Sequence, residues 1–422
     1  MRNKQKKIGI LIGSLEAGGA QRMALWLFES LNRVGVETYL LSVDYNKDIM
    51  LPSTESTKPS SLSERIIILS PFSVNLPTIL KFFFTPYQWL RLQLYLYRQE
   101  FDCLISFMER ANILNLCTFG THNKVLSIRS HPDLYISKDL LKQKSIDFIY
   151  SHVLPRASSV VFNANEAKDA FVERYSVGNT ICRTIYNYCP AKTVRKLAEE
   201  KLPKTHSHLF EAPVLLAVGR LKPEKGFIQL IRAFREVAKS NNAVRLVILG
   251  EGPLRRPLEN QIVSLNLSER VFLPGFFDNP MPWINSAHIF VLPSIWEGFP
   301  NALLEALTLG TAIISTDCRS GPREILSPGS RPSEKTKQVE ITPFGILCPP
   351  LSFSSSNFAT AVTEQEIQIA ESVKRLLNDE HLRQDLIGNS AQRAKEFSPE
   401  NILPEWLDLI QTSPSCFSIH SG

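Results

Sequence analysis

The stretch VLPSIWEGFPNALLEALTLGTAIISTDCRSGPREIL, residues 291–326, predicts a strand, a turn and a helix in close succession. The apolar run that ends at Leu292 is typical of a buried strand. Gly298 permits a tight turn, and Pro300 suits the first position of the helix that we expect over residues 301–309. Strand, turn and helix in this order are the repeating unit of an α/β sheet.

Two carboxylates flank this turn, Glu297 just before the expected helix and Glu305 inside it. The N-terminus of a helix offers unpaired backbone N–H groups and a partial positive charge, so it is a favourable seat for phosphate. Glutamates beside that seat could accept hydrogen bonds from hydroxyls next to the phosphate. A sugar nucleotide has this layout, because hydroxyl-rich ends flank its diphosphate. The alternative is a buried strand and an amphipathic helix with two solvated glutamates.

A specific motif favours the sugar nucleotide. The segment contains a five-residue run and a second glutamate eight positions after the first, Glu297-Gly298-Phe299-Pro300-Asn301 and Glu305. This pattern resembles the EGFPN…E signature of glycosyltransferase family 4, whose members are retaining enzymes with the GT-B fold. The downstream segments 315–317 and 320–324 extend the match, and the resemblance covers nearly the whole chain.

The resemblance implies a role for each residue of the motif. Glu305 would bind the ribose hydroxyls, and Glu297 would contact the hexose near its C3 and C4 hydroxyls. The backbone around Phe299, Pro300 and Asn301 would face the sugar and the phosphate, although Pro300 has no N–H to donate.

Strand-like runs alternate with helical patterns along both halves of the chain, and this alternation predicts parallel, doubly wound sheets. We expect strands at 8–12, 39–43, 103–107, 125–128, 159–162, 214–218, 246–249, 271–273, 289–292 and 312–315, and helices at 21–33, 86–98, 168–175 and 227–240. A chain of 422 residues exceeds what one hydrophobic core usually spans. The fold class is therefore α/β, with two Rossmann-like domains that face a cleft and bind ligands at the carboxyl ends of strands.

The expected domain boundaries follow from composition. Residues 1–190 would form an N-terminal, acceptor-side domain, and residues 191–212 a linker rich in charge and proline. Residues 213–396 would form the donor-binding domain. Residues 397–422 would form a C-terminal helix, which in the resembled family crosses back to the first domain, and a tail. The polar, Pro-rich residues 326–358 predict an insertion of mobile loops.

The loop after the expected strand 214–218 turns at Gly219 and then carries two cations, Arg220 and Lys225. Departure of a nucleoside diphosphate develops negative charge on the β-phosphate, and fixed cations aimed at that charge lower the barrier. Both cations match the paired cations of the family motif, whereas Lys222 does not and is interpreted as solvated. The alternative is ordinary surface charge. No D-x-D motif occurs, so we expect metal-independent stabilisation of the leaving group, with no metal site and no cofactor beyond the donor.

Other glycine-containing loops follow other strands. Gly18 and Gly19 resemble the family's glycine-rich loop, which lets backbone approach the donor phosphates and the acceptor. The loop does not match G-x-G-x-x-G. The alternative is that its glycines serve only to turn the chain. Gly250 and Glu251 resemble a loop that shapes the nucleotide-base pocket, and Glu251 as a direct ligand is left open. Arg129 and His131 follow another strand and are candidates for contacting the acceptor. Their alternative is a capped loop, and relatives commonly have Asn in place of His131.

Charge and apolar patterning bear on location. Residues 1–190 hold 22 Lys and Arg against 16 Asp and Glu, so they carry the whole net charge of +6. Such an excess could attract an anionic membrane or an anionic acceptor. A chance imbalance of surface charge explains it equally well. Residues 79–97 are aromatic-rich and read either as a core helix or as an amphipathic membrane-surface helix. No export signal, spanning helix or C-x-x-C motif is evident, so we expect a cytoplasmic protein, peripheral at most to the inner face of the membrane.

The best interpretation is a retaining transferase that moves a hexose or N-acetylhexosamine from a nucleotide-sugar, UDP-linked by expectation, to a saccharide or lipid-linked saccharide. No nucleic-acid partner is expected. Two alternatives share the fold: a nucleotide-sugar 2-epimerase and a non-catalytic scaffold that binds sugar nucleotides. The EGFPN…E motif disfavours the first, and the full set of charged motif residues disfavours the second. The missing G-x-G-x-x-G disfavours an oxidoreductase.

Overall fold

A computed structural model describes residues 6–15, 18–45, 62–70, 78–132, 140–353 and 361–412. The chain divides into two compact units, and each contains one seven-stranded sheet. The first unit comprises Met1–Asn163, Ala167–Tyr186 and Ile402–Gly422, and the second Ala164–Glu166 and Asn187–Asn401. The prediction of two Rossmann-like α/β domains is confirmed.

The sheet of the first unit has the strand order β3-β2-β1-β4-β5-β6-β7, and all of its paired strands are parallel. The strands are β1 (Lys7–Ile12), β2 (Glu37–Ser42), β3 (Ile66–Ile68), β4 (Cys103–Phe107), β5 (Asn123–Ile128), β6 (Ser159–Phe162) and β7 (Ile181–Thr184). Every residue of β4, β5 and β6 is buried, as expected for parallel strands covered on both faces. The sequence analysis missed the edge strands β3 and β7, because β3 is very short and β7 is only half-buried and carries Arg183.

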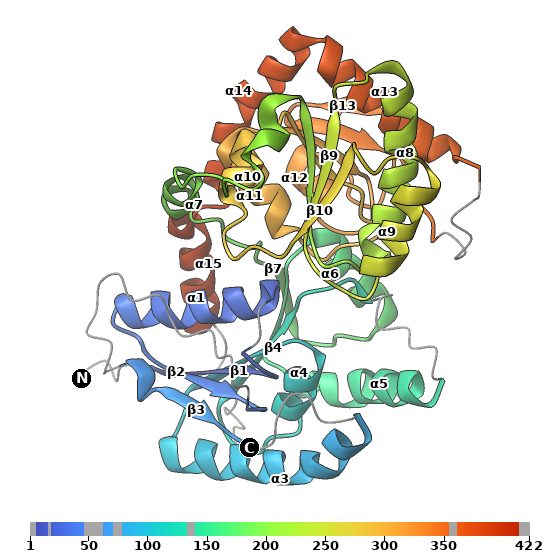
Figure 1. The fold of residues 1–422 in the computed structure, drawn as a ribbon. Coiled ribbons are helices and arrows are strands. Elements are labelled where there is room, and N and C mark those ends of the chain that lie inside the picture. The colour runs from blue at the N-terminus through green and yellow to red at the C-terminus, as the bar shows by residue number, and fades with distance from the viewer. Residues whose placement is uncertain are drawn as a thin grey trace. The chain divides into compact units, whose positions relative to one another are not determined.

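Helices cover the first sheet on opposite sides, as α1 and α3 do in Figure 1. They are α1 (Gly19–Arg33), α3 (Thr78–Gln99), α4 (Glu109–Leu116), α5 (Leu140–Val153), α6 (Asn165–Arg174) and α15 (Pro399–Thr412), of which α6 and α15 have residues in both units. Trp406 of α15 is fully buried, and its ring centroid lies 6.0 Å from that of Phe107 at the end of β4. This packing attaches the C-terminal part of α15 to the first unit.

The second sheet has the order β10-β9-β8-β11-β12-β14-β13, in which only the pair β13 and β14 is antiparallel. Its strands are β8 (Val214–Val218), β9 (Arg245–Leu249), β10 (Val271–Gly275), β11 (Ile289–Leu292), β12 (Ala312–Thr316), β13 (Glu340–Thr342) and β14 (Gly345–Cys348). The chain order reverses between β8 and β11, which are neighbours in the sheet. In open α/β sheets such a reversal marks the point where ligands bind.

The helices of the second unit are α7 (Ala191–Ala198), α8 (Phe227–Ser240), α9 (Arg255–Ser264), α10 (Met281–Ser286), α11 (Asn301–Leu309), α12 (Pro322–Leu326), α13 (Glu364–Asn378) and α14 (Glu380–Glu396). Helices α8 and α13 pack against each other beside the sheet (Figure 1). The apolar core lies between these helices and the strands, with Phe227, Phe234 and Val373 among its buried members.

Two segments contain helices or strands that the sequence analysis did not predict. The expected linker contains α7, which packs against α10 and α11, and a short 3-10 helix, Ser207–Glu211. The expected mobile insertion contains the hairpin of β13 and β14, whose inner strand completes the parallel part of the sheet. Strand β14 is an apolar run of only four residues between Pro343 and Pro349, and for this reason the sequence analysis predicted a loop there. Residues 354–358 of the insertion lie outside the described residues.

Candidate active site

The loops after β8 and β11 lie at the carboxyl ends of the two neighbouring strands where the chain order reverses. The backbone N–H of Ile295 donates to the carbonyl of Glu224 at 2.8 Å and so joins the two loops. Gly226 then begins α8 with φ +68°, and an added Cβ there would lie 1.9 Å from the carbonyl oxygen of Pro293. The close approach of the two loops therefore requires glycine at this position.

This approach brings together Lys225 and Glu297, two residues for which the sequence analysis expected roles in one site. The Nζ of Lys225 lies 2.6 Å from Oε1 of Glu297, and Ser294 donates its hydroxyl to the same oxygen at 2.6 Å. Glu297 is 8% exposed, so its carboxylate is held in a place where water screens charge weakly. The Lys225 side chain keeps 25% of its surface exposed, so its charge is held in position and is still reachable.

Arg220 and Gly219 lie in the same loop, directly after β8. The N–H of Gly219 continues the sheet by donating to the carbonyl of Leu249 at 2.9 Å, and the Arg220 residue that follows is exposed. Glu251, by contrast, points its exposed carboxylate toward Arg255 at 2.9 Å. The backbone carbonyl of Glu251 accepts from Leu221 at 2.9 Å, which ties the loops after β8 and β9 together.

Gly250 is the contact point of those two loops. Its φ is +140°, and a Cβ at this position would lie 1.9 Å from the carbonyl oxygen of Gly219. We therefore expect Gly250→Ala to destabilise the fold by about 1–3 kcal/mol from backbone strain alone. Urea denaturation measures this effect.

Gly388→Ala is the matched control for Gly250→Ala. Gly388 lies within α14, and a Cβ there would meet nothing within 4 Å. Alanine should leave stability unchanged or raise it by up to ~1 kcal/mol, because alanine favours a helix interior over glycine. Equal stability of the two variants would contradict the close approach at Gly250.

The turn into α11 forms the next part of the site. Pro300 is the N-cap of α11, whereas the sequence predicted it at the first helical position. Its carbonyl accepts the first helical hydrogen bond, from Leu303 at 3.1 Å. Its side chain has no acceptor with which to cap the helix, so the N-terminal end keeps the partial positive charge that suits an anion. Glu305 lies just over one turn into the helix and is 7% exposed.

Asn187 positions this turn, although the sequence analysis did not single it out. Its side-chain amide donates to the carbonyl of Phe299 at 3.0 Å and to Oδ1 of Asn301 at 2.7 Å. Asn187 precedes Asn301 by more than a hundred residues, so no local motif connects them. Gly298, the remaining motif residue, lies between Glu297 and Phe299 within the turn, and its carbonyl oxygen would be 3.2 Å from a Cβ added at Gly321.

The acceptor candidates lie in the first unit. The guanidinium of Arg129 lies 5.3 Å from the ring centroid of Phe107 and 5.9 Å from that of Trp406. Burial lowers the pKa of Arg129 to about 9. One nitrogen donates to the carbonyl of Ile185 at 3.4 Å, whereas Nε and Nη2 are buried and lack a hydrogen-bond partner within the described part of the chain. His131, 3% exposed, lies two residues further along the loop after β5.

The glycine-rich loop of the first unit begins α1. Gly18 is the N-cap of this helix with extended backbone, φ −177°, and Gly19 is its first residue. The carbonyl of Gly18 accepts from the N–H of Arg22 at 3.0 Å. Glu16 and Ala17, in the middle of the predicted loop, lie outside the described residues.

Comparison with known proteins shows the family to which the chain belongs. Residues 199–339 match the family described as glycosyl transferases group 1. An uncharacterized glycosyltransferase of Methanocaldococcus jannaschii is 32% identical over 292 residues, which cover 68% of this chain and 71% of the relative. The chain belongs to the group 1 glycosyltransferases.

Two further proteins resemble this glycosyltransferase over nearly its whole length. A Campylobacter jejuni enzyme, N-acetylgalactosamine-N,N'-diacetylbacillosaminyl-diphospho-undecaprenol 4-alpha-N-acetylgalactosaminyltransferase, is 27% identical over 94% of this chain and 97% of its own. The crystal structure of Anabaena HepE in complex with UDP has a TM-score of 0.72 at 16% identity, covering 96% and 99% of the two chains. The second likeness concerns the fold, and the expected GT-B fold, with its two parallel-sheet domains, is confirmed.

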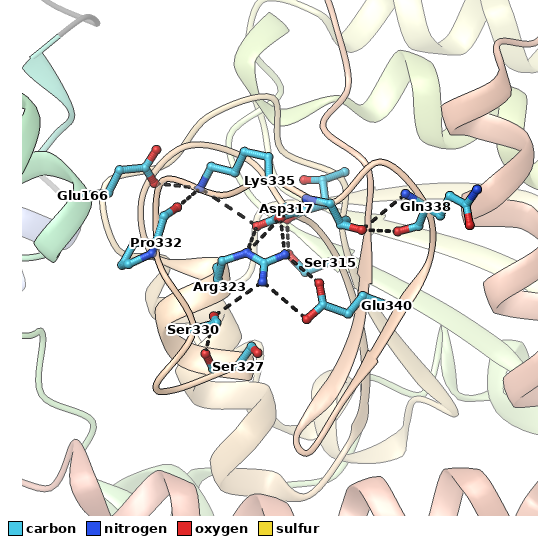
Figure 2. A network of polar contacts seen from close by, with 12 residues as sticks. Glu166, Ser315, Asp317, Arg323, Ser327, Ser330, Pro332, Lys335, Gln338 and Glu340 are labelled. Atoms are coloured by element: carbon cyan, nitrogen blue, oxygen red, sulfur yellow. Dashed lines mark hydrogen bonds and ion pairs between the residues drawn. The ribbon is translucent and has the colours of Figure 1, made fainter.

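An ionic network joins residues in and after β12 of this glycosyltransferase (Figure 2). Arg323 of α12 contacts both oxygens of Asp317 at 2.6–3.1 Å and also reaches Glu340 at 2.7 Å. Lys335 lies 2.7 Å from Glu166, and Glu166 accepts from the backbone N–H of Ser320 at 2.8 Å. The network therefore fixes the segment after β12, which packs on the α11 turn.

Gly321 lies where the segment after β12 contacts the turn before α11. Its φ is +92°, and an added Cβ would lie 2.6 Å from Cδ of Pro300. The N–H of Glu297 donates to the carbonyl of Arg319 at 3.1 Å and joins the same two segments. The sequence analysis included this segment in the family match but assigned no role to its charges.

We expect Arg323→Leu to lower the free energy of unfolding by about 3–5 kcal/mol, because it leaves the fully buried Asp317 without its main partner. Arg331→Leu is the matched control, since Arg331 and its partner Glu334 are largely exposed and such pairs contribute ~1 kcal/mol or less. Urea denaturation of both variants tests this. Similar losses in both would show that the buried pair does not stabilise the fold.

The described residues contain neither a metal-binding cluster nor a membrane-spanning helix. No group of three or more His, Cys, Asp or Glu side chains within them is arranged to hold a metal ion. No helix within them is both long and apolar enough to cross a bilayer. Their six cysteines are free thiols, and burial raises the pKa of Cys103 to about 12.

Proposed function

We propose that this glycosyltransferase is a retaining enzyme of family 4 that transfers a hexose or N-acetylhexosamine from a UDP-sugar to a saccharide carried on a lipid diphosphate. The observation that carries the proposal is the Lys225 and Glu297 pair, 2.6 Å apart, at the reversal point of the second sheet. The pair lies in loops that lead directly into the N-termini of α8 and α11. A cation and a helix N-terminus suit a diphosphate, and a carboxylate beside them can accept hydrogen bonds from sugar hydroxyls.

The donor would lie along these loops. Arg220 and Lys225 bind the diphosphate, and the N-terminus of α11 at Asn301 adds its partial positive charge. Glu297 accepts hydrogen bonds from hexose hydroxyls, and Glu305 accepts them from the ribose. Gly219, Gly250 and Glu251 line the side of the base.

Retention follows from a loose, oxocarbenium-like transition state in which the acceptor hydroxyl attacks from the side that the diphosphate leaves. The bond from the anomeric carbon to the diphosphate oxygen breaks as the bond to the acceptor oxygen forms, and the departing diphosphate takes the acceptor's proton. The protein contributes position and electrostatics, with no covalent intermediate. The two cations offset the charge on the leaving group, so we propose that no metal ion is needed.

The relatives support the acceptor class. The Campylobacter enzyme is named for an acceptor on diphospho-undecaprenol, and its match spans nearly all of both chains. A second Campylobacter jejuni relative, 24% identical over 96% of this chain, is also named for a saccharide on PP-undecaprenol. We therefore propose that Arg129 and His131 contact the acceptor, with Gly18 and Gly19 near the reacting groups, and that the enzyme works at the inner face of the cytoplasmic membrane.

The test is nucleotide release from a panel of UDP-, GDP- and ADP-sugars by the purified protein, with EDTA present and no acceptor. Slow release of UDP from one UDP-sugar, unaffected by EDTA, is the expected result and names the sugar. Loss of activity in EDTA would contradict metal independence. Formation of free 2-epimerised sugar would favour the epimerase. Binding of a donor without turnover would favour the scaffold, and absence of both binding and turnover would contradict the proposal.

A further inference from the structure

Helix α3 of the first unit has one face in the core and another face in solvent. Gln88, Leu92 and Leu96 are buried, and the two leucines pack in the cluster that contains Leu11 and Leu41 of the sheet. The helix lies below the strands of the first sheet in the view of Figure 1. The two readings of residues 79–97, core helix and surface helix, thus describe different faces of one element.

The solvent face of α3 carries a stripe of large apolar side chains. These side chains recur with spacings of four, three, four and three residues, which places them on one side of a helix. The exposed stripe consists of Phe83 (71% exposed), Tyr87 (39%), Leu90 (49%), Leu94 (46%) and Tyr97 (83%). Side chains of this size at such spacing form a continuous patch, and patches of this kind mark interaction sites.

The stripe widens at Phe119, which follows α4 and is 57% exposed. Its ring lies edge-on to Trp89 of α3 with centroids 5.9 Å apart, and its backbone is bonded in both directions to the Gln93 side chain. The guanidinium of Arg156 lies 5.7 Å from the same ring. The α3 surface therefore combines an apolar patch with a cation at its edge.

The charges within α3 have one sign, and the first acidic residue after the helix is the exposed Glu100. Thr78–Gln99 contains no acidic residue, and its exposed Arg91 and Arg98 flank the stripe. Arg91 also donates to the Tyr87 hydroxyl at 3.3 Å, which keeps its charge beside the apolar side chains. The whole net positive charge of the protein lies in residues 1–190, the part of the sequence that contains α3.

We propose that the α3 surface docks on an anionic lipid bilayer, with the stripe Phe83, Tyr87, Leu90, Leu94 and Tyr97 in the interface and the arginines on lipid phosphates. An amphipathic helix that lies in the plane of a bilayer combines an apolar face with Lys or Arg at its polar edge, and tyrosines suit the interfacial region. The inference deepens the proposed function, because an enzyme that docks this way meets a lipid-linked acceptor at the surface where it resides.

A second copy of the chain is a poorer occupant for this surface. Two copies related by a two-fold axis would bring the same stripe together from both sides. Arg91 and Arg98 of both copies would then lie close together, and α3 offers no carboxylate to pair with them. An anionic bilayer instead places phosphates opposite these arginines, and each cation near such a surface contributes about 1 kcal/mol.

The experiment is co-sedimentation of the full chain with vesicles of phosphatidylcholine alone or with phosphatidylglycerol. The wild type should bind the anionic vesicles and release with salt, since exposed charges are screened. The double variants Leu90→Gln/Leu94→Gln and Arg91→Glu/Arg98→Glu should each weaken binding by about tenfold or more. Val263→Gln, a change at a 65% exposed residue of α9, should bind like the wild type.

Basal UDP release, measured without vesicles, distinguishes a failure of the docking proposal from a failure of the proposed function. The α3 variants should retain it, which shows that they fold, and its absence in the wild type would count against the proposed function alone. Failure of the wild type to bind anionic vesicles, or equal binding by the α3 variants, would overturn the docking proposal. A dimer of the wild type that is lost in Leu90→Gln/Leu94→Gln would assign the surface to a second copy and would also overturn it.

Discussion

Replacing either Arg220 or Lys225 by alanine should lower kcat by ~10²-fold or more, with a smaller change in KM for the donor. Each cation is proposed to meet charge that develops on the diphosphate only as the bond to the sugar breaks, and interactions of that kind act on the transition state. The geometry supports this for Lys225, whose Nζ is held by Glu297 at 2.6 Å and remains partly exposed. Steady-state kinetics of UDP release and of transfer would measure the effect.

Lys222→Ala is the control for both variants. Lys222 belongs to the same loop and has the same charge, but it does not match the family motif. It should keep nearly full activity. If Arg220→Ala and Lys225→Ala were as active as Lys222→Ala, these cations would have no part in stabilising the leaving group.

The second large effect separates the two glutamates of the motif. Glu297→Gln should lower kcat by about 10²-fold, because it removes both the charged acceptor for the sugar hydroxyls and the anion that holds Lys225 in place. Glu305→Gln should instead raise the donor KM and the Kd for UDP by about tenfold, since contacts to the ribose are equally strong before and during reaction. Kinetics with the best donor and calorimetry with UDP would distinguish the two.

Glu259→Gln serves as the control for these changes, because Glu259 lies on the exposed side of α9 and pairs only with Arg255 among the contacts described. It should behave like the wild type in both measurements. The opposite pattern, with kcat lost in Glu305→Gln and the UDP Kd raised in Glu297→Gln, would exchange the roles of the two glutamates.

Local sequence was sufficient to predict the parts of the fold that depend on local pattern. The ten predicted strands all exist, and α8 and α11 begin and end where the sequence predicted. Long apolar runs and turns with Gly or Pro can be recognised from about ten consecutive residues. Elements built from them can therefore be predicted from local sequence. The strands β3, β7, β13 and β14 were missed because they are short and lie at or near sheet edges.

The groups that hold the site in place left no such signal. Asn187 reaches Phe299 and Asn301 across more than a hundred residues, and Lys335 reaches Glu166 across a similar gap. These contacts exist only because the chain folds the two segments together. The motif thus named the residues that we propose for the donor, whereas the contacts that support these residues are visible only in the structure.

The α3 helix shows why a single reading of residues 79–97 was insufficient. Its heptad-like pattern contains two apolar faces, and the sequence alone does not say which one the sheet covers. The structure buries Leu92 and Leu96 and exposes Leu90 and Leu94. Because both faces carry leucine and aromatic side chains, only the packing against the sheet separates core from surface.

The most direct test of the proposed reaction is the anomeric configuration of its product. The enzyme would be incubated with the UDP-sugar that the panel identifies, α-linked in the donor, and with a saccharide on a synthetic lipid diphosphate. Nuclear magnetic resonance of the new anomeric proton reports the linkage. An α linkage to the saccharide, formed with EDTA present, is the predicted result, and a β linkage would contradict retention and the leaving-group-side attack on which the mechanism rests.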